Sequence, residues 1–125
     1  MSARFLRRTL GACVVAASLS ALAVAPDGGA TSATAARACQ PPDYPGSGYF
    51  TSLSVKHTTC AKGKKLAVAY YNCRIENGGK DGRCNRRVMR YRCTEERNRI
   101  ETELDARVRC RRGERRVTHT YQQNL

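Results

Sequence analysis

The stretch Ile100–Cys110, IETELDARVRC, decides how this chain folds. Every second residue is apolar or small and uncharged, and every residue between them is charged. A period of two places successive side chains on opposite faces of a β-strand, which a helix cannot do. The stretch therefore predicts a strand with one buried face and one charged, solvated face.

A second alternating stretch, Arg115–Tyr121, follows a glycine and predicts the partner strand of a hairpin. A two-residue turn at Arg112-Gly113 makes the apolar sides of both strands coincide, and a slip of one residue would destroy that match. On the outer side, Arg109 then faces Arg116, a like-charged pair that is mildly destabilising. The expected inward pairs are Cys110–Arg115, Val108–Val117, Ala106–His119 and Leu104–Tyr121.

Two further strands are predicted upstream. Tyr49–Val55 alternates, with Tyr49, Thr51, Leu53 and Val55 on one side. In Arg87–Cys93, the residues Met89, Tyr91 and Cys93 share one side, whereas Val88, Arg90 and Arg92 share the other. Arg90 and Arg92 are expected beside Glu101, Glu103 or Asp105 on the neighbouring strand, as a ladder of opposite charges.

A helix is expected between these strands. Thr58-Thr59 can cap a helix that starts near Cys60, and Asn77-Gly78-Gly79 is a good stop. A turn of 100° per residue puts these residues on one apolar face: Cys60, Ala61, Ala67, Val68, Tyr71 and Ile75. The predicted fold class is α+β, with one helix packed on a small antiparallel sheet in the order β-α-β-β-β.

The N-terminal residues are predicted to be a leader and not part of this fold. Three arginines precede an apolar run from Leu10 to Ala25, which is typical of a secretory signal peptide. We expect residues 1–38 to be signal and processing region, cut between 30 and 38, and residues 39–125 to be one small domain. The domain has no second apolar run, so we expect no transmembrane segment and a location outside the cell or in its envelope.

Six cysteines remain in the predicted domain, and an even number in a short exported chain indicates three disulfides. They are Cys39, Cys60, Cys73, Cys84, Cys93 and Cys110. The pair expected first is Cys73–Cys84, which flanks a Gly-rich loop. Cys93–Cys110 is disfavoured, because the expected strands place these two at opposite ends of their pair, beyond the reach of about 7 Å between Cα atoms.

Three segments resemble a group of small exported bacterial domains. They are SVKHTTCAKG from Ser54, RYRC from Arg90 and ARVRCRRGERRV from Ala106. Those domains share a Cys-Ala helix start and strands of the pattern G-Y-x-C and V-x-C-x-x-G, and Arg90 stands where a glycine is usual. The resemblance covers most of the predicted domain, and it implies the fold and export but supplies no site residues.

The predicted domain is strongly basic. From Cys39 onward it has 19 lysines and arginines and nine acidic residues, a net charge of +10. Arg83, Arg86 and Arg87 are expected near the predicted hairpin. The candidate binding residues lie on the hairpin itself: Arg107, Arg109, Arg111, Arg112, Arg115 and Arg116. Such a charge attracts anionic polymers, envelope components or acidic proteins.

The sequence therefore predicts a secreted basic binding or surface protein. The alternative is a protein inhibitor or secreted effector acting on another protein, because a small stapled sheet offers a rigid surface. A third hypothesis is a secreted ribonuclease using His57 and His119 as acid and base. The Cys-Lys-x-x-Asn-Thr-x motif of pancreatic-type ribonucleases is absent, and His119 falls on the inward side. We expect no catalytic residues, no metal and no cofactor.

Overall fold

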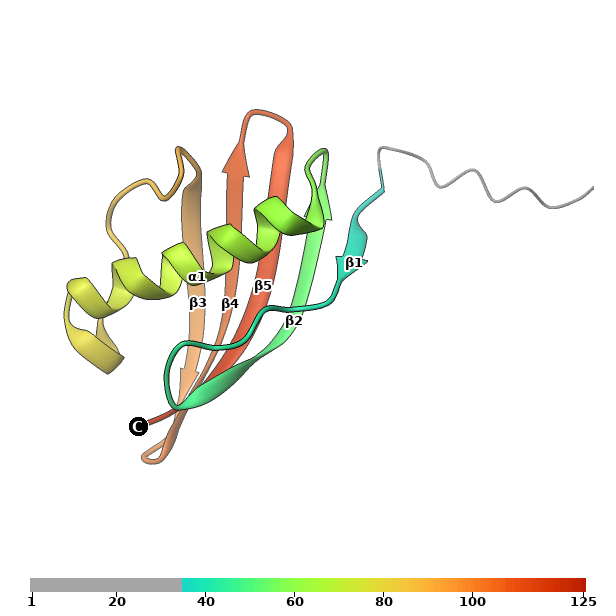
Figure 1. The fold of residues 1–125 in the computed structure, drawn as a ribbon. Coiled ribbons are helices and arrows are strands. Elements are labelled where there is room, and N and C mark those ends of the chain that lie inside the picture. Colours follow the sequence, from blue (N-terminus) through green and yellow to red (C-terminus); the bar gives the residue numbers. More distant parts are fainter. Residues whose placement is uncertain (1–34) are drawn as a thin grey trace, which may run out of the picture.

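The structure, a computed structural model, describes residues 35–125. A five-stranded antiparallel sheet in the order β1-β2-β5-β4-β3 carries one long helix, α1, across one face (Figure 1). The elements are β1 (Arg37–Cys39), β2 (Gly48–Lys56), α1 (Cys60–Glu76), the short 3-10 helix η1 (Gly79–Asp81), β3 (Arg92–Arg99), β4 (Glu103–Arg112) and β5 (Arg115–Asn124). The predicted α+β class is confirmed, with β1 as an additional strand.

Most of the predicted leader lies outside the described residues. The exception is its last part, where Arg37 and Ala38 pair with β2 as part of β1. A cut after Ala38 would therefore remove two of the three residues of this edge strand.

The β4–β5 hairpin forms as predicted, but with a different turn. Gly113 has a φ of 57° at the first position of a Gly113-Glu114 turn, as a type II′ hairpin requires. The register is consequently shifted by two residues from the prediction. An even shift keeps every inward side chain inward, so the predicted faces are right and the predicted pairs are wrong. The observed inward pairs are Cys110–Val117, Val108–His119, Ala106–Tyr121 and Leu104–Gln123.

Two predicted strand boundaries, at Arg87 and at Ile100, are wrong, and they lie on either side of β3. Val88 and Tyr91 form a tight turn, in which each backbone N–H donates to the other's carbonyl, at 3.0 and 2.7 Å. Met89 and Arg90 have φ values of 49° and 68°, the positive pair of a type I′ turn. The strand therefore begins at Arg92 and not at Arg87. At its far end, Ile100 belongs to the loop before β4 and is 53% exposed.

This correction also explains the disulfides. Because β3 begins at Arg92, Cys93 lies directly opposite Cys110 in the register, and the two form a disulfide with Cα atoms 4.0 Å apart. The prediction against this pair was wrong. The expected Cys73–Cys84 bond is confirmed, and Cys39–Cys60 ties β1 to the start of α1.

Helix α1 begins as predicted, but a different face packs on the sheet. The Thr59 hydroxyl accepts a hydrogen bond from the Lys62 backbone N–H at 3.1 Å, and the helix ends at Glu76. A Cβ on Gly63 would lie 2.7 Å from Val55 Cγ1, so this glycine allows the helix to approach β2 closely. Of the predicted apolar face, only Ala67 is buried. The buried residues are Gly63, Leu66, Ala67, Tyr70, Cys73 and Arg74.

Strand β2 changes its facing side at a bulge. Phe50 pairs with Tyr121 and Ser52 with Thr120, so Thr51 is an extra residue. Phe50, Leu53 and Val55 point to the core, whereas Tyr49 and Thr51 are exposed, contrary to the prediction. An inserted residue offsets the alternation by one, which the sequence pattern alone does not reveal.

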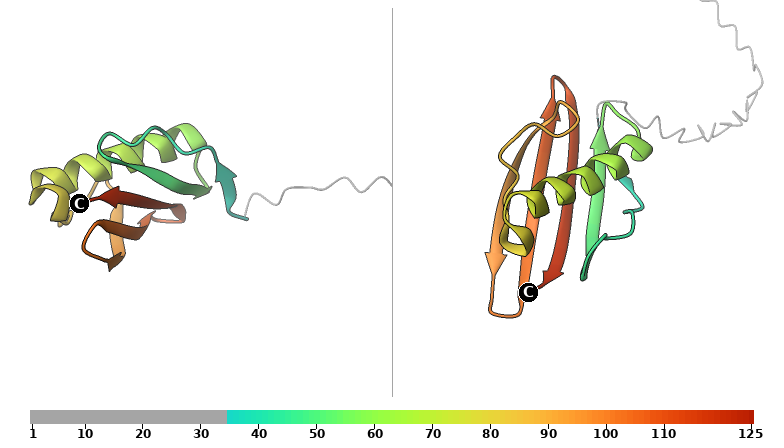
Figure 2. Two further views of the ribbon diagram at one scale, coloured as in Figure 1. Left: turned by 90° about the horizontal axis from the view of Figure 1, so that it is seen from below. Right: turned by 60° about the vertical axis from the view of Figure 1, so that its left-hand side comes forward.

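Two further views show that α1 covers only one face of the sheet (Figure 2). Within residues 35–125, no helix lies over the opposite face, which we call the outer face. The core between α1 and the sheet contains fifteen buried hydrophobic residues, from Phe50 to Tyr121. The outer face carries mostly polar and charged side chains and is open to solvent.

Candidate anion-binding face

The outer face is organised in rows that run across the strands. In the row nearest the β4–β5 turn, Arg92 on β3 pairs with Arg111 on β4, Arg111 with Arg116 on β5, and Arg116 with Lys56 on β2. We call these four residues the cation row. Neighbouring strands lie about 4.8 Å apart, so the row spans roughly 14 Å.

The cation row has no acidic counterpart. Across residues 35–125, no ion pair joins any of its four members to a carboxylate. The Arg116 guanidinium donates to the Gly113 carbonyl at 2.9 Å, a contact that leaves its charge uncompensated. Like charges directly opposite one another destabilise a sheet, so folding alone does not favour this arrangement.

A pocket of about 350 Å³ opens on the outer face at the same place. Three members of the cation row, Arg92, Arg111 and Arg116, line it, together with Arg109 and the threonines Thr94 and Thr118. Arg109 is held by Glu96 at 2.6 Å, whereas the other guanidiniums remain available to a ligand. Guanidinium groups and hydroxyls are donors suited to phosphate, sulfate or carboxylate oxygens.

The structure separates the six predicted binding residues into two groups. Arg107, Arg109, Arg111 and Arg116 lie on the outer face, and Arg109 pairs across the strands with Thr118 and not with Arg116. Arg112 and Arg115 pair with each other at the end of the hairpin, on the side that faces α1. They therefore do not contribute to the pocket.

Sequence reasoning did not find the two ends of the row, Arg92 and Lys56. The predicted strand from Arg87 put Arg92 beside acidic residues, but its observed partner is Arg111 and Arg90 lies in a turn. Of the arginines expected nearby, Arg86 and Arg87 line a neighbouring pocket of about 340 Å³ that Arg92 also borders. The signal for Lys56 was the alternation of Leu53 and Val55, which places it outward.

The inner face of β3 holds a buried charged group that the sequence pattern did not reveal. The Glu95 carboxylate accepts hydrogen bonds from Arg97 Nε and the Tyr70 hydroxyl, both at 2.7 Å, and from the Tyr121 hydroxyl. Arg74 is fully buried, with its Nε 3.8 Å from Glu95 and its guanidinium over the Tyr121 ring. We call Glu95, Arg97, Arg74, Tyr70 and Tyr121 the Glu95 cluster.

Hydrogen bonding controls the charge of this cluster. Burial raises the pKa of Glu95, but hydrogen bonds from Arg97, Tyr121 and Tyr70 outweigh it and hold that pKa below its usual value. Burial and the bond to Glu95 raise the pKa of Tyr70 and of Tyr121. The carboxylate is thus ionised and, with a further bond from Arg97 Nη2 at 3.2 Å, accepts four hydrogen bonds from protein donors, which suits a structural role.

The two histidines do not form a site together. His119 is 1% exposed and packs edge-on against Phe50 and Tyr70, as predicted for an inward residue. Burial lowers its pKa to about 4, and neither ring nitrogen has a hydrogen-bond partner within residues 35–125. His57 is exposed in the loop before α1. A two-histidine ribonuclease needs both imidazoles at one substrate, and this geometry does not supply them.

Among residues 35–125, no three histidine, cysteine or acidic side chains gather in a way that could hold a metal ion. Over the same residues, no helix has the length and apolar character needed to cross a membrane.

Comparisons with known proteins give no relative. No protein-family model matches the chain, and neither a curated protein nor a solved structure is detectably similar to it. The resemblance to exported bacterial domains therefore stays a prediction, and the candidate site depends on its geometry alone.

Proposed function

We propose that this protein is an exported binding protein for anionic polymers, and that the cation row holds the anionic groups. The observation that carries the proposal is the row itself: four cations are neighbours across four strands, and within the described chain none has an acidic partner. A rigid sheet fixes their spacing before a ligand arrives, which lowers the entropic cost of binding.

Two further observations support this proposal. From Cys39 onward the chain carries a formal net charge of +10, which favours encounter with anionic surfaces. Three disulfides staple the domain, and such bonds persist in oxidising compartments outside the cytoplasm. Export places the cation row where envelope polymers with phosphate or carboxylate groups would be met.

The test compares two variants that each lose three positive charges. Arg92→Gln/Arg111→Gln/Arg116→Gln removes most of the cation row, and Lys62→Gln/Lys65→Gln/Lys80→Gln removes exposed lysines from α1 and η1. Binding of long-chain inorganic polyphosphate is measured by calorimetry at several salt concentrations. We expect the row variant to bind at least about tenfold more weakly, with the salt slope reduced by about two units.

The lysine variant serves as the matched control. Because both variants have the same net charge, a non-specific attraction would be weakened equally in both. Equal weakening would mean that the charge acts only as a general solvated surface. Weakening by the lysine variant alone would move the binding site to α1.

A further inference from the structure

We infer that the ligand is a hydroxyl-rich anionic polymer, such as a polyol-phosphate chain or an anionic glycan, and that a groove on the same outer face binds its hydroxyl groups. The row Thr94–Arg109–Thr118–Ser54 separates this groove from the cation row. The inference rests on the proposed function and names the ligand class for the same face.

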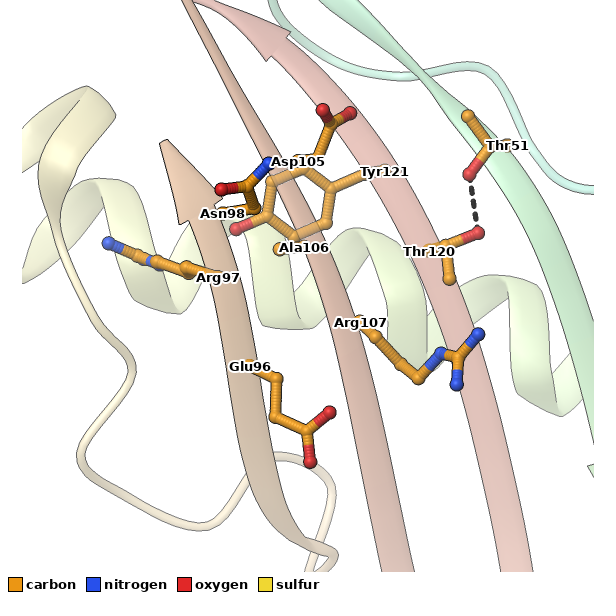
Figure 3. Close-up of a pocket in the computed structure, with 9 residues that line it drawn as sticks. All are labelled: Thr51, Glu96, Arg97, Asn98, Asp105, Ala106, Arg107, Thr120 and Tyr121. Atoms are coloured by element: carbon orange, nitrogen blue, oxygen red, sulfur yellow. Dashed lines mark hydrogen bonds between the residues drawn. The ribbon is translucent and has the colours of Figure 1, made fainter. Parts of the chain in front are cut away.

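The groove lies further along the strands, away from the β4–β5 turn. It has a volume of about 470 Å³, and its outward lining side chains are Thr51, Glu96, Asn98, Asp105, Arg107 and Thr120. All but Thr51, the extra residue of the β2 bulge, belong to two consecutive rows, Glu96–Arg107–Thr120–Ser52 and Asn98–Asp105–Gln122–Tyr49. Figure 3 views this face with α1 behind the sheet and shows the hydrogen bond between the Thr51 and Thr120 hydroxyls.

The chemistry of these rows differs from that of the cation row. The two rows contain two carboxylates, Glu96 and Asp105, and one guanidinium, Arg107, and Glu96 is already paired with Arg109 of the adjacent row. The remaining members are amides, hydroxyls and one phenol. Asp105 is exposed and, among the described residues, joins no ion pair. A carboxylate only accepts hydrogen bonds, so a ligand lying on Asp105 has to bring donors.

A phosphate oxygen is therefore a poor occupant of the groove, because it also only accepts and is repelled by Asp105. Hydroxyl groups both donate and accept, and so match carboxylates, amides and hydroxyls alike. A single ligand that covers both regions has an anionic group at the cation row and neutral hydroxyls beside it. That combination defines a polyol phosphate or an anionic glycan.

Nucleic acid fits this face less well. Proteins that bind single strands stack the bases on exposed aromatic side chains beside a basic track. Among the described residues, Tyr49 is the exposed tyrosine on this face. It lies in the second row of the groove, the one further from the cation row. Its hydroxyl is bonded to Gln122, whereas Tyr70, Tyr91 and Tyr121 are buried. The bases would find no stacking partner near the cation row.

Two probes with equal numbers of phosphates separate the groove from the row: poly(glycerol phosphate), which carries hydroxyls, and inorganic polyphosphate, which does not. Asp105→Ala removes a negative charge and a hydrogen-bond acceptor. We expect it to strengthen the binding of polyphosphate, because a repulsive charge is lost, and to weaken that of poly(glycerol phosphate) about fivefold, because a charged acceptor is lost. The opposite signs are the signature of a groove that binds hydroxyls.

A second variant, Asn98→Ala/Thr120→Val, leaves the charge unchanged, with Asn72→Ala on the exposed side of α1 as its control. We expect at least about a threefold loss for poly(glycerol phosphate) and none for polyphosphate. Strengthened binding of both probes by Asp105→Ala, or equal effects of the second variant on both, would overturn the inference. The inference would also be overturned if the second variant lost as much affinity for an oligothymidylate as for poly(glycerol phosphate). Failure of the proposed function would appear separately, as unchanged polyphosphate binding by the row variant.

Discussion

The two faces of the sheet differ in how their charged side chains are paired. On the inner face, the Glu95 carboxylate is 4% exposed and is engaged by Arg97, Arg74 and two tyrosine hydroxyls. On the outer face, Arg92, Arg111 and Arg116 lie side by side, and none of them forms an ion pair with a carboxylate of the described residues. The two groups share strands β3 and β5, where Glu95 follows Arg92 and Tyr121 follows Arg116 by a few residues.

The difference follows from desolvation. An unpaired ion is very costly inside a protein, so a buried charge persists only with partners that satisfy it. Water screens neighbouring charges on an exposed face, and their repulsion costs only tenths of a kcal/mol to about 1 kcal/mol. The inner cluster therefore has to be complete for the protein to fold. The outer row is tolerated by folding but not required by it, and this leaves its charge available for binding.

The largest expected effect is the loss of the inner carboxylate. Glu95→Gln leaves Arg74 and Arg97 without a counter-charge between α1 and the sheet, and breaking such a buried group costs about 3–5 kcal/mol. Urea denaturation of the disulfide-bonded protein measures this loss.

The neighbouring residue gives a matched control. Glu96→Gln makes the same chemical change on the outer face, where the pair with Arg109 is exposed, and is expected to cost less than about 1 kcal/mol. Similar losses in both variants would show that the contrast between the two faces is wrong.

The same contrast explains how far sequence reasoning reached. The inward residues of β4 and β5 are apolar, so their alternation predicted both strands and their facing sides. The segment Arg92–Arg99, RCTEERNR, contains no apolar residue besides Cys93, because Glu95 and Arg97 occupy its inward positions. A strand with buried ions looks like a polar loop, and so β3 was placed too early in the chain.

The candidate site was predicted in part for the same reason. An even register shift preserved the outward direction of Arg107, Arg109, Arg111 and Arg116, although every predicted partner was wrong. The displaced β3 hid Arg92, and the bulge at Thr51 hid the true outward residues of β2. The cation row is a property of register across four strands, which single-strand patterns do not contain.

An intermediate effect concerns His119, whose ring nitrogens have no hydrogen-bond partner among the described residues. Its pKa is lowered to about 4 by burial, so the folded state releases a proton that the unfolded chain binds below about 6.5. Stability is therefore complete above pH 6.5 and falls as the pH drops from 6.5 to 4, by about 3 kcal/mol. Glu95, whose pKa is also lowered, adds a loss at lower pH, when its carboxylate becomes protonated.

Urea denaturation at a series of pH values between 7 and 4.5 tests this prediction. His119→Leu replaces the imidazole by an apolar side chain of similar size that does not titrate. The free energy of unfolding of this variant should be nearly independent of pH across this range. The comparison is between pH slopes, so a constant packing cost in the variant does not affect it. A slope equal to that of the wild type would assign the pH dependence to another group.

The smallest expected effect is that of the cation row on folding. Arg92→Gln/Arg111→Gln/Arg116→Gln relieves like-charge repulsion and should raise the free energy of unfolding by no more than about 1 kcal/mol at low salt. Because salt screens exposed charges, raising NaCl from 0.05 to 0.5 M should stabilise the wild type more than the variant and make their free energies of unfolding more alike.

Arg116→Gln alone controls for the bond to the Gly113 carbonyl, which helps to fix the turn. If the triple variant were strongly destabilised while Arg116→Gln were not, the cation row would stabilise the sheet. Folding would then be enough to account for its charge, without a ligand. If instead repulsion is relieved and polyphosphate binding is lost in the same variant, the protein maintains an unfavourable arrangement of charge that only a ligand makes favourable.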